Sequence, residues 1–155
     1  MNVKLSLAAG LSALVLAGTP AVAADALNPE TRANLQAAMH GEAFAHLKYQ
    51  AYAEVARAHG RQDLAKLFEQ AAKVEGDEHF AREANALKLA GSDEANLADA
   101  IAGETYETTT MYVDFARAAD KAGDTKVAAM FRQIAEDEAD HQAKYEAALA
   151  KLKTR

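Results

Sequence analysis

Cysteine is absent from the 155-residue chain, and proline occurs only twice, at Pro20 and Pro29. Without cysteine the protein can form no disulfide, and any iron or zinc site held by thiolates is excluded. Because proline interrupts helices, a chain that has none after Pro29 can be helical almost throughout. We therefore expect the mature chain to be nearly all helix.

Basic residues are also scarce relative to acidic ones. The chain has 17 Lys and Arg against 23 Asp and Glu, which gives a formal net charge of −6. This excess of negative charge argues against nucleic acid or an anionic membrane as a partner. A metal cation suits it better.

The first residues have the composition of a secretory signal peptide. Lys4 provides a positive charge, residues 5–16 are apolar apart from small residues, and Ala21-Val22-Ala23 is a small-x-small cleavage site. The apolar run is shorter than the ~20 residues that span a bilayer. We expect residues 1–23 to be removed, the protein to be exported to the periplasm, and residues 24–155 to form one domain.

Capping signals divide the mature chain into four long helices. Asn28-Pro29-Glu30 provides an N-cap, a proline in the first turn and an acidic residue beside it, and Gly60 provides a stop. The next helices are predicted over about 62–89 with an end at Gly91, from Ser92 or Asp93 to Gly123, and from Asp124 to near Lys153. Four helices of similar length predict an all-α four-helix bundle.

The second half of the chain repeats the first. Residues 33–42 align with residues 95–104 at an offset of 62, and residues 67–75 align with 130–138 at an offset of 63. The bundle is therefore predicted to contain two copies of one helical hairpin.

The repeat contains one irregularity in the third helix. Tyr112 follows Glu104 by eight residues, whereas Tyr49 follows Glu42 by seven. An extra residue in a helix without other interruptions predicts a π-bulge, a feature that often marks functional sites. A longer turn at Gly123 is the alternative.

Acidic residues interrupt the apolar stripe of every helix. In the fourth helix the stripe runs at helical spacing through Phe131, Ile134, Glu138, His141 and Tyr145. A single Glu-x-x-His pair is weak evidence, since most such pairs lie on a solvated face, but the repeat brings acidic residues of all four helices to one level. The resulting set is Glu42, Glu75, Glu78, Glu104, Glu107, Glu138 and His141.

This set of side chains predicts a pair of metal ions inside the bundle. A buried carboxylate without a positive partner is strongly destabilising, and two divalent or trivalent ions come close to balancing the negative charge. Many oxygen ligands and one nitrogen suit iron or manganese better than copper. The absence of thiolates argues against structural zinc.

These residues resemble a known family. The segment from Gly103-Glu104 through Glu107 to Tyr112, the segment from Gly41-Glu42 to Tyr49, and the Glu138-x-x-His141 pair are similar to the erythrin domain of rubrerythrins, a ferritin-like di-iron fold. The resemblance covers almost the whole mature chain. It implies two iron ions, with manganese or a mixed pair as the alternative.

The resemblance also implies a role for each site residue. Glu75 and Glu138 would bridge the two metals, Glu42 and Glu107 would serve one ion, and Glu104 and His141 would serve the other. Tyr49 and Tyr112 would hydrogen-bond the ligating carboxylates and orient them.

The chain departs from the family pattern on the second helix. Rubrerythrins usually carry Glu-x-x-His there as well, and one iron moves between that histidine and a glutamate of the third helix. Here the matching position is Glu78, followed by His79. We expect Glu78 to be the ligand, with His79 and His46 exposed or beside the ligands; the alternative is that His79 reaches the site through a helix adjustment near Gly76.

A second departure is that the chain has no rubredoxin domain, because it contains no cysteine to bind the iron of such a domain. Electrons would therefore come from an external donor. The expected function is that of a peroxidase-type oxidoreductase that reduces hydrogen peroxide. The alternatives are a ferroxidase or dioxygen-reducing centre and a non-catalytic periplasmic metal-binding protein.

The connection between the second and third helices limits the topology. Residues 90–93 can span at most ~14 Å, too little to cross a bundle from end to end. The bundle is then either a plain up-down-up-down one, or the hairpins of two chains are exchanged. The resemblance favours the second arrangement, because some rubrerythrin relatives with similarly short links are dimers with exchanged helices, and we expect such a homodimer.

Overall fold

The computed structural model describes residues 27–154, so the predicted signal peptide lies outside the described residues. The first hairpin consists of α1 (Pro29–Ala58), α2 (Gln62–Val74), the π-helix η1 (Glu75–Phe80) and α3 (Ala81–Leu87). The second consists of α4 (Asp93–Tyr106), the π-helix η2 (Glu107–Met111), α5 (Tyr112–Ala122) and α6 (Thr125–Leu152). The prediction of two helical hairpins in an all-α chain is confirmed.

The helix starts follow the predicted caps with one exception. The Asn28 side chain accepts a hydrogen bond of 2.9 Å from the Glu30 N–H, and the Ser92 hydroxyl oxygen accepts one of 3.2 Å from the Ala95 N–H. Asp124 precedes α6 as predicted, but its side chain makes no capping hydrogen bond.

The helix ends differ from the prediction at one place. Gly60 and Gly123 adopt the left-handed conformation that ends a helix, with φ of 71° and 86°. The second long helix ends at Leu87, before Gly91, because Lys88 takes the left-handed position with φ of 52°. The N–H groups of Lys88 and Leu89 bond back into α3 in the pattern that glycine-terminated helices use, and these bonds offset the strain.

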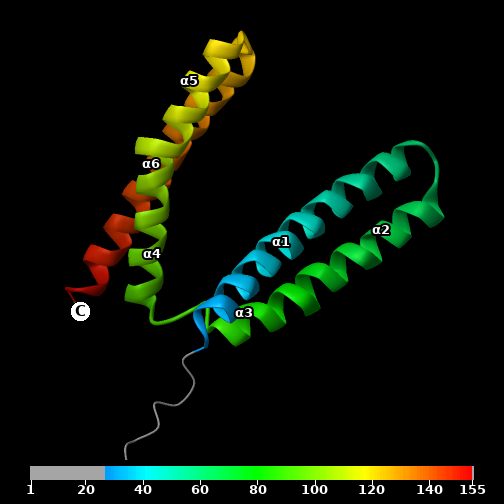
Figure 1. Cartoon of the computed structure of the whole chain (residues 1–155), viewed down its shortest axis with the longest axis horizontal. Coiled ribbons are helices and arrows are strands. Elements are labelled where there is room, and N and C mark those ends of the chain that lie inside the picture. The colour runs from blue at the N-terminus through cyan, green and yellow to red at the C-terminus, as the bar shows by residue number, and fades with distance from the viewer. Residues whose placement is uncertain (1–26, 155) are drawn as a thin grey trace, which may run out of the picture.

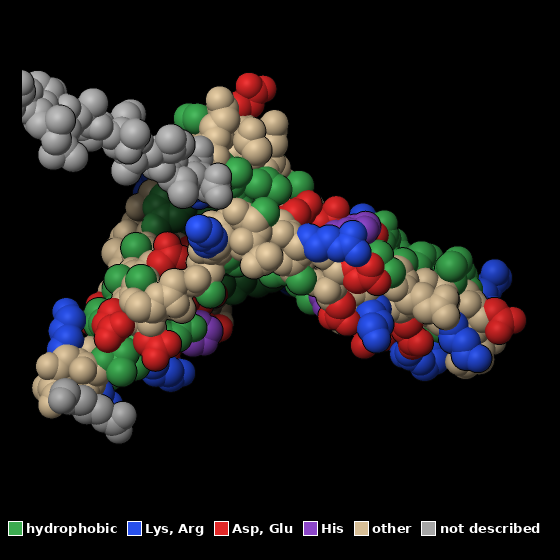
Figure 2. All heavy atoms as spheres, turned by 90° about the horizontal axis from the view of Figure 1, so that it is seen from below, with side chains coloured by type: hydrophobic (Ala, Val, Ile, Leu, Met, Phe, Trp, Pro, Cys, Tyr) green, Lys and Arg blue, Asp and Glu red, His purple; other side chains and the backbone are tan. Residues whose placement is uncertain are grey.

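Within each hairpin the helices pack through alanine. Six of the buried apolar residues are alanines, and the larger ones are Met39 and Leu87. Small side chains let two helices approach closely but bury little apolar area. Many large hydrophobic side chains stay exposed: Phe44, Leu47, Tyr52, Val55, Leu64, Leu67, Val74, Leu89, Tyr106, Val113, Phe115, Val127 and Met130. Figure 2 shows hydrophobic side chains at the surface of both arms, among acidic ones.

The two hairpins form separate arms. Figure 1 shows them diverging from the short connection between α3 and α4. Among residues 27–154, no element of the first hairpin contacts an element of the second. The plain single-chain bundle, one of the two predicted alternatives, is therefore not the arrangement of the described chain.

The described helices include none that is both long enough and apolar enough to cross a membrane.

Candidate metal centre

The first hairpin brings Glu42, Glu75 and His79 together, and we call this group the first half-site. Glu42 comes from α1, and the other two come from η1. His79 Nδ1 lies 2.8 Å from a carboxylate oxygen of Glu75 and 3.8 Å from one of Glu42. The carboxylates are mostly covered, since the Glu42 and Glu75 side chains are 27% and 20% exposed.

The second hairpin repeats this arrangement with Glu104, Glu138 and His141, the second half-site. Glu104 comes from α4, and Glu138 and His141 come from α6. His141 Nδ1 lies 2.6 Å from a carboxylate oxygen of Glu138, whose side chain is 19% exposed. Each half-site therefore combines one carboxylate from the first helix of its hairpin with a carboxylate and an imidazole from the second.

The carboxylates of each half-site repel one another. A hydrogen bond to Glu75 raises the pKa of Glu42, and desolvation and the Glu75 charge act in the same direction, while His79 opposes them. Desolvation raises the pKa of Glu104, together with the negative charges of Glu138 and Glu107. Both half-sites thus carry unbalanced negative charge that a cation would neutralise.

The donor atoms fit metal ions. In each half-site one potential ligand atom from every member lies within 4.8 Å of the others. Ligands at about 2.0–2.2 Å from one ion are separated by distances of this order. A carboxylate oxygen of Glu83, on α3, is also buried and has no hydrogen-bond partner among residues 27–154, and the negative charge of Glu83 raises the pKa of Glu42 further. Oxygen donors with one imidazole suit iron or manganese.

Two predicted ligands lie outside these groups. Glu78 points away toward Arg82, with a charged hydrogen bond of 3.0 Å, and its side chain is 54% exposed. Glu107, at the start of η2, is half-buried and lies close enough for its charge to raise the pKa of both Glu104 and Tyr112. The structure thus brings His79, the alternative to Glu78, into the first half-site.

The π-helix η1 explains the position of His79. Glu75 aligns with Glu138 at an offset of 63, but His79 aligns with His141 at 62. The second helix therefore contains one extra residue between its glutamate and its histidine, and the wider π turn accommodates it. The same kind of signal predicted η2, which the structure confirms: the Tyr112 N–H bonds to the Glu107 carbonyl, five residues back.

Tyr49 and Tyr112 belong to matching aromatic groups beside the half-sites. Tyr49 stacks on Phe68 with ring centroids 6.2 Å apart, and Tyr112 lies 6.0 Å from Phe131. Desolvation, followed by the charges of nearby glutamates, raises the pKa of Tyr112. Among the described residues neither tyrosine hydrogen-bonds a carboxylate, so the predicted orienting role stays a prediction.

Comparison with known proteins identifies the family of the chain. The rubrerythrin family model matches residues 33–149. The chain is similar to a rubrerythrin of Porphyromonas gingivalis, with 37% identity over 134 residues that cover 78% of this chain and 66% of the relative. Nigerythrin of Nitratidesulfovibrio vulgaris is 36% identical over 131 residues, covering 76% and 65%. The chain thus spans slightly less than two thirds of the length of these two relatives.

Two further similarities extend the comparison. Rubrerythrin-1 of Clostridium acetobutylicum is 31% identical over 139 residues, which cover 79% of this chain and 71% of the relative. A solved structure of nigerythrin in its fully reduced, all-ferrous state matches 97% of this chain and 82% of its own, with 29% identity and a TM-score of 0.42. The family match includes all six residues of the two half-sites, and the chain belongs to the rubrerythrin family.

Proposed function

We propose that the protein is a di-iron oxidoreductase that reduces hydrogen peroxide with electrons from an external donor. The observation that carries this proposal is the pair of half-sites, each with two carboxylates and one imidazole whose potential ligand atoms lie within 4.8 Å of one another. Their charge and donor types suit iron, with manganese or a mixed pair as the alternative metals. The family relationship supports the same reading.

The complete centre needs both half-sites. One half-site offers three protein ligands, whereas a redox-active ion of this kind takes more, and the two half-sites of one chain lie on separate arms. We infer that the first hairpin of one chain packs against the second hairpin of a partner. Such a homodimer would contain two bundles, each with a di-metal centre built by both chains.

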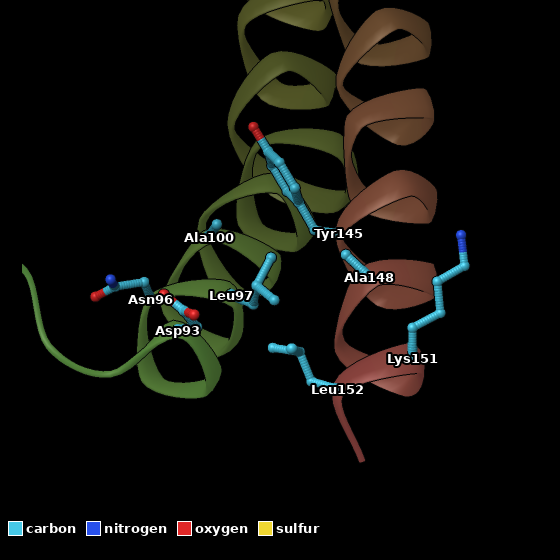
Figure 3. Close-up of a pocket in the computed structure, with 8 residues that line it drawn as sticks. All are labelled: Asp93, Asn96, Leu97, Ala100, Tyr145, Ala148, Lys151 and Leu152. Carbon is cyan, nitrogen blue, oxygen red and sulfur yellow. The ribbon is translucent and has the colours of Figure 1, made fainter. Parts of the chain in front are cut away.

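The exposed apolar surface supports this assembly. Between α4 and α6 the second hairpin has a groove of about 610 Å³, and Leu97, Tyr145 and Leu152 point into it (Figure 3). Together with the large hydrophobic side chains exposed on both hairpins, this groove is apolar surface of the kind that a partner covers. A second copy is the natural one, because its first hairpin carries the matching half-site.

The chain's own residues would prepare the centre for the reaction. Reduction of one hydrogen peroxide molecule to two of water takes two electrons and two protons, and two ferrous ions, when bound, supply the electrons. The carboxylates of the two half-sites would hold the ions and balance their charge. The Tyr112 hydroxyl carries its proton at neutral pH, as tyrosines ordinarily do, and burial and the neighbouring glutamates raise its pKa further, so it would be able to donate a hydrogen bond at the centre.

Mixed dimers test the shared centre. One variant carries E42Q and E75Q in the first half-site, and the other carries E104Q and E138Q in the second. If hairpins are exchanged, one bundle of the mixed dimer contains all four glutamines and the other contains none. The bundle without glutamine then binds two ions. If each chain forms its own bundle, every bundle lacks one of its two half-sites, and the purified mixed dimer will show the same metal content and spectrum as the two parent variants.

Stopped-flow mixing tests the reaction. The reduced, iron-loaded protein should be reoxidised faster by hydrogen peroxide than by dioxygen. Faster reaction with dioxygen would favour a ferroxidase or oxygen-reducing centre. Retention of iron without turnover by either oxidant would favour a metal-binding protein.

The proposal also includes where the protein is located and what donates its electrons. The leader-like composition of residues 1–23 supports export to the periplasm. Because the chain has no cysteine-bound relay, the donor would be a separate protein or small molecule. Mass spectrometry of the N-terminus of the protein isolated from its own cells would test export, since the mature chain should begin at about Ala24.

A further inference from the structure

We propose that His46 is a positioning residue that holds η1 in its π-helical form and thereby sets His79 at the first half-site. The inference rests on the proposed function, because it assumes that the half-site binds metal. His46 lies on α1, four residues after Glu42, and crosses to the second helix of the hairpin. It is not a member of either half-site.

The imidazole of His46 is fixed at both nitrogens. Nδ1 lies 2.7 Å from the Ala72 carbonyl oxygen, which can only accept, so Nδ1 carries the proton. Nε2 then has a free lone pair and accepts a hydrogen bond of 3.0 Å from the Gln50 side-chain amide. Both ring nitrogens are therefore engaged in hydrogen bonds, and neither is available for a metal ion.

The contact with Ala72 lies at the start of the π-helix. Ala72 is three residues before Glu75, and its carbonyl also accepts from the Glu75 N–H. A π turn shifts backbone N–H groups to carbonyls five residues back, so carbonyls near its start need other donors. His46 supplies a second donor to the Ala72 carbonyl, and this donor comes from the opposite helix.

Gly76 provides the space for this contact. A Cβ atom at position 76 would lie 2.6 Å from His46 Nδ1, closer than two such atoms can approach. Glycine inside a helix is destabilising relative to alanine. The close approach of the His46 ring gives a structural reason for accepting that cost one residue after a metal-ligand candidate.

The second hairpin stabilises its π-helix in a different way. There the Thr105 carbonyl, two residues before η2, accepts hydrogen bonds of 3.1 Å and 2.6 Å from the hydroxyls of Thr108 and Thr109. These donors come from the same helix. In the first hairpin the donor comes from α1, so the position of His79 depends on the packing of α1 against η1.

The orientation of the His46 ring can be tested in the unmodified protein. In ¹⁵N-detected NMR of the full chain, we expect His46 as the neutral tautomer with the proton on Nδ1. A proton on Nε2, or a freely exchanging ring, would overturn the inference without any variant. This measurement needs no metal.

The effect on His79 is tested with the protein loaded with Co²⁺. In the wild type, two exchangeable imidazole N–H signals should be shifted strongly by the ion, one from His79 and one from His141. We expect H46A to lose the signal of His79 and to bind the ion at the first half-site roughly 10-fold more weakly. H46Q, which keeps a donor for the Ala72 carbonyl, should restore the signal. H40A removes an exposed histidine of α1 and is the control.

Gly76→Ala gives an independent test. It should displace the His46 ring and have the effect of H46A, whereas adding G76A to H46A should change the Co²⁺ signals no further, because the ring is already gone. If H46A and G76A both keep two signals and wild-type affinity, the positioning role is refuted. If the wild type itself binds no Co²⁺ or shows no shifted imidazole signal, the proposed metal centre fails instead.

Discussion

Glu75 and His79 are four residues apart, yet the imidazole Nδ1 lies 2.8 Å from the Glu75 carboxylate. The counterpart pair in the second hairpin, three residues apart, makes the same contact at 2.6 Å. The π-helix between Glu75 and Phe80 absorbs the additional residue. Both hairpins can therefore present the same donor set although their helices differ in length.

This relationship predicts different effects for neighbouring substitutions. His79→Ala removes a donor from the first half-site, and we expect metal affinity there to fall by more than about 10-fold. Glu78→Ala removes only an exposed partner of Arg82, and we expect affinity to be unchanged. Anaerobic titration with Fe²⁺ measures both. Loss of binding in E78A with retention in H79A would make Glu78 the ligand after all.

Sequence reasoning predicted the helical hairpins because their caps and apolar stripes are local signals. It predicted η2 because the repeat offset changes between two recognisable pairs, Glu42 with Glu104 and Tyr49 with Tyr112. The offset also changes between the pair Glu75 with Glu138 and the pair His79 with His141, and this change would have predicted η1. Glu78 was predicted as the ligand because it lies three residues after Glu75, as His141 does after Glu138, and which of Glu78 and His79 binds the metal stays a prediction.

Other features of the site could not be predicted from local sequence. The contact of His46 with Ala72 depends on how α1 packs against α2, and periodicity within one helix carries no information about it. The separation of the two hairpins could not be predicted either. The short connection at residues 90–93 limited the possible topologies to two but did not select one of them. A length limit excludes an end-to-end crossing but does not choose between packing within one chain and packing between two.

Glu138 is expected to be indispensable for the metal centre. Its carboxylate contacts His141 and is largely covered, so Glu138→Ala removes a ligand and leaves its partners without a bridge. We expect the variant to lose at least one of two ions in metal analysis. Glu136→Ala, an exposed carboxylate on the same helix, is the matched control and should bind two. Two ions bound to the Glu138→Ala protein would contradict the bridging assignment.

The alanine packing of the hairpins predicts sensitivity to larger side chains. Ala128 is fully buried between α5 and α6, so Ala128→Leu must push the helices apart. Overpacking of this kind costs about 1–3 kcal/mol in the free energy of unfolding. Ala129→Leu, at the exposed neighbouring position, should have little effect. Urea denaturation of both at equal protein concentration makes the comparison, and equal stability would show that α5 and α6 do not pack closely at Ala128.

The stability of the metal-free protein should depend on pH through Glu42 and Glu104. Both have pKa values raised above 4.5 in the folded state, by the hydrogen bond to Glu75 and by desolvation respectively. A raised pKa means that the folded protein binds these protons more tightly than the unfolded chain does. Their contribution to stability is therefore fully present below pH 4.5 and is lost as the pH rises through the raised values.

The comparison that isolates this effect uses the E42Q/E104Q variant, whose amides imitate protonated carboxyl groups. With a chelator present, the free energy of unfolding of the wild type should fall relative to that of the variant as the pH rises from 4.5 toward neutral. Adding Fe²⁺ or Mn²⁺ anaerobically at neutral pH should reverse the difference, because the ions neutralise the carboxylates and bind only the folded wild type tightly. A difference that does not change with pH would mean that the glutamates of the two half-sites do not repel one another in the folded protein.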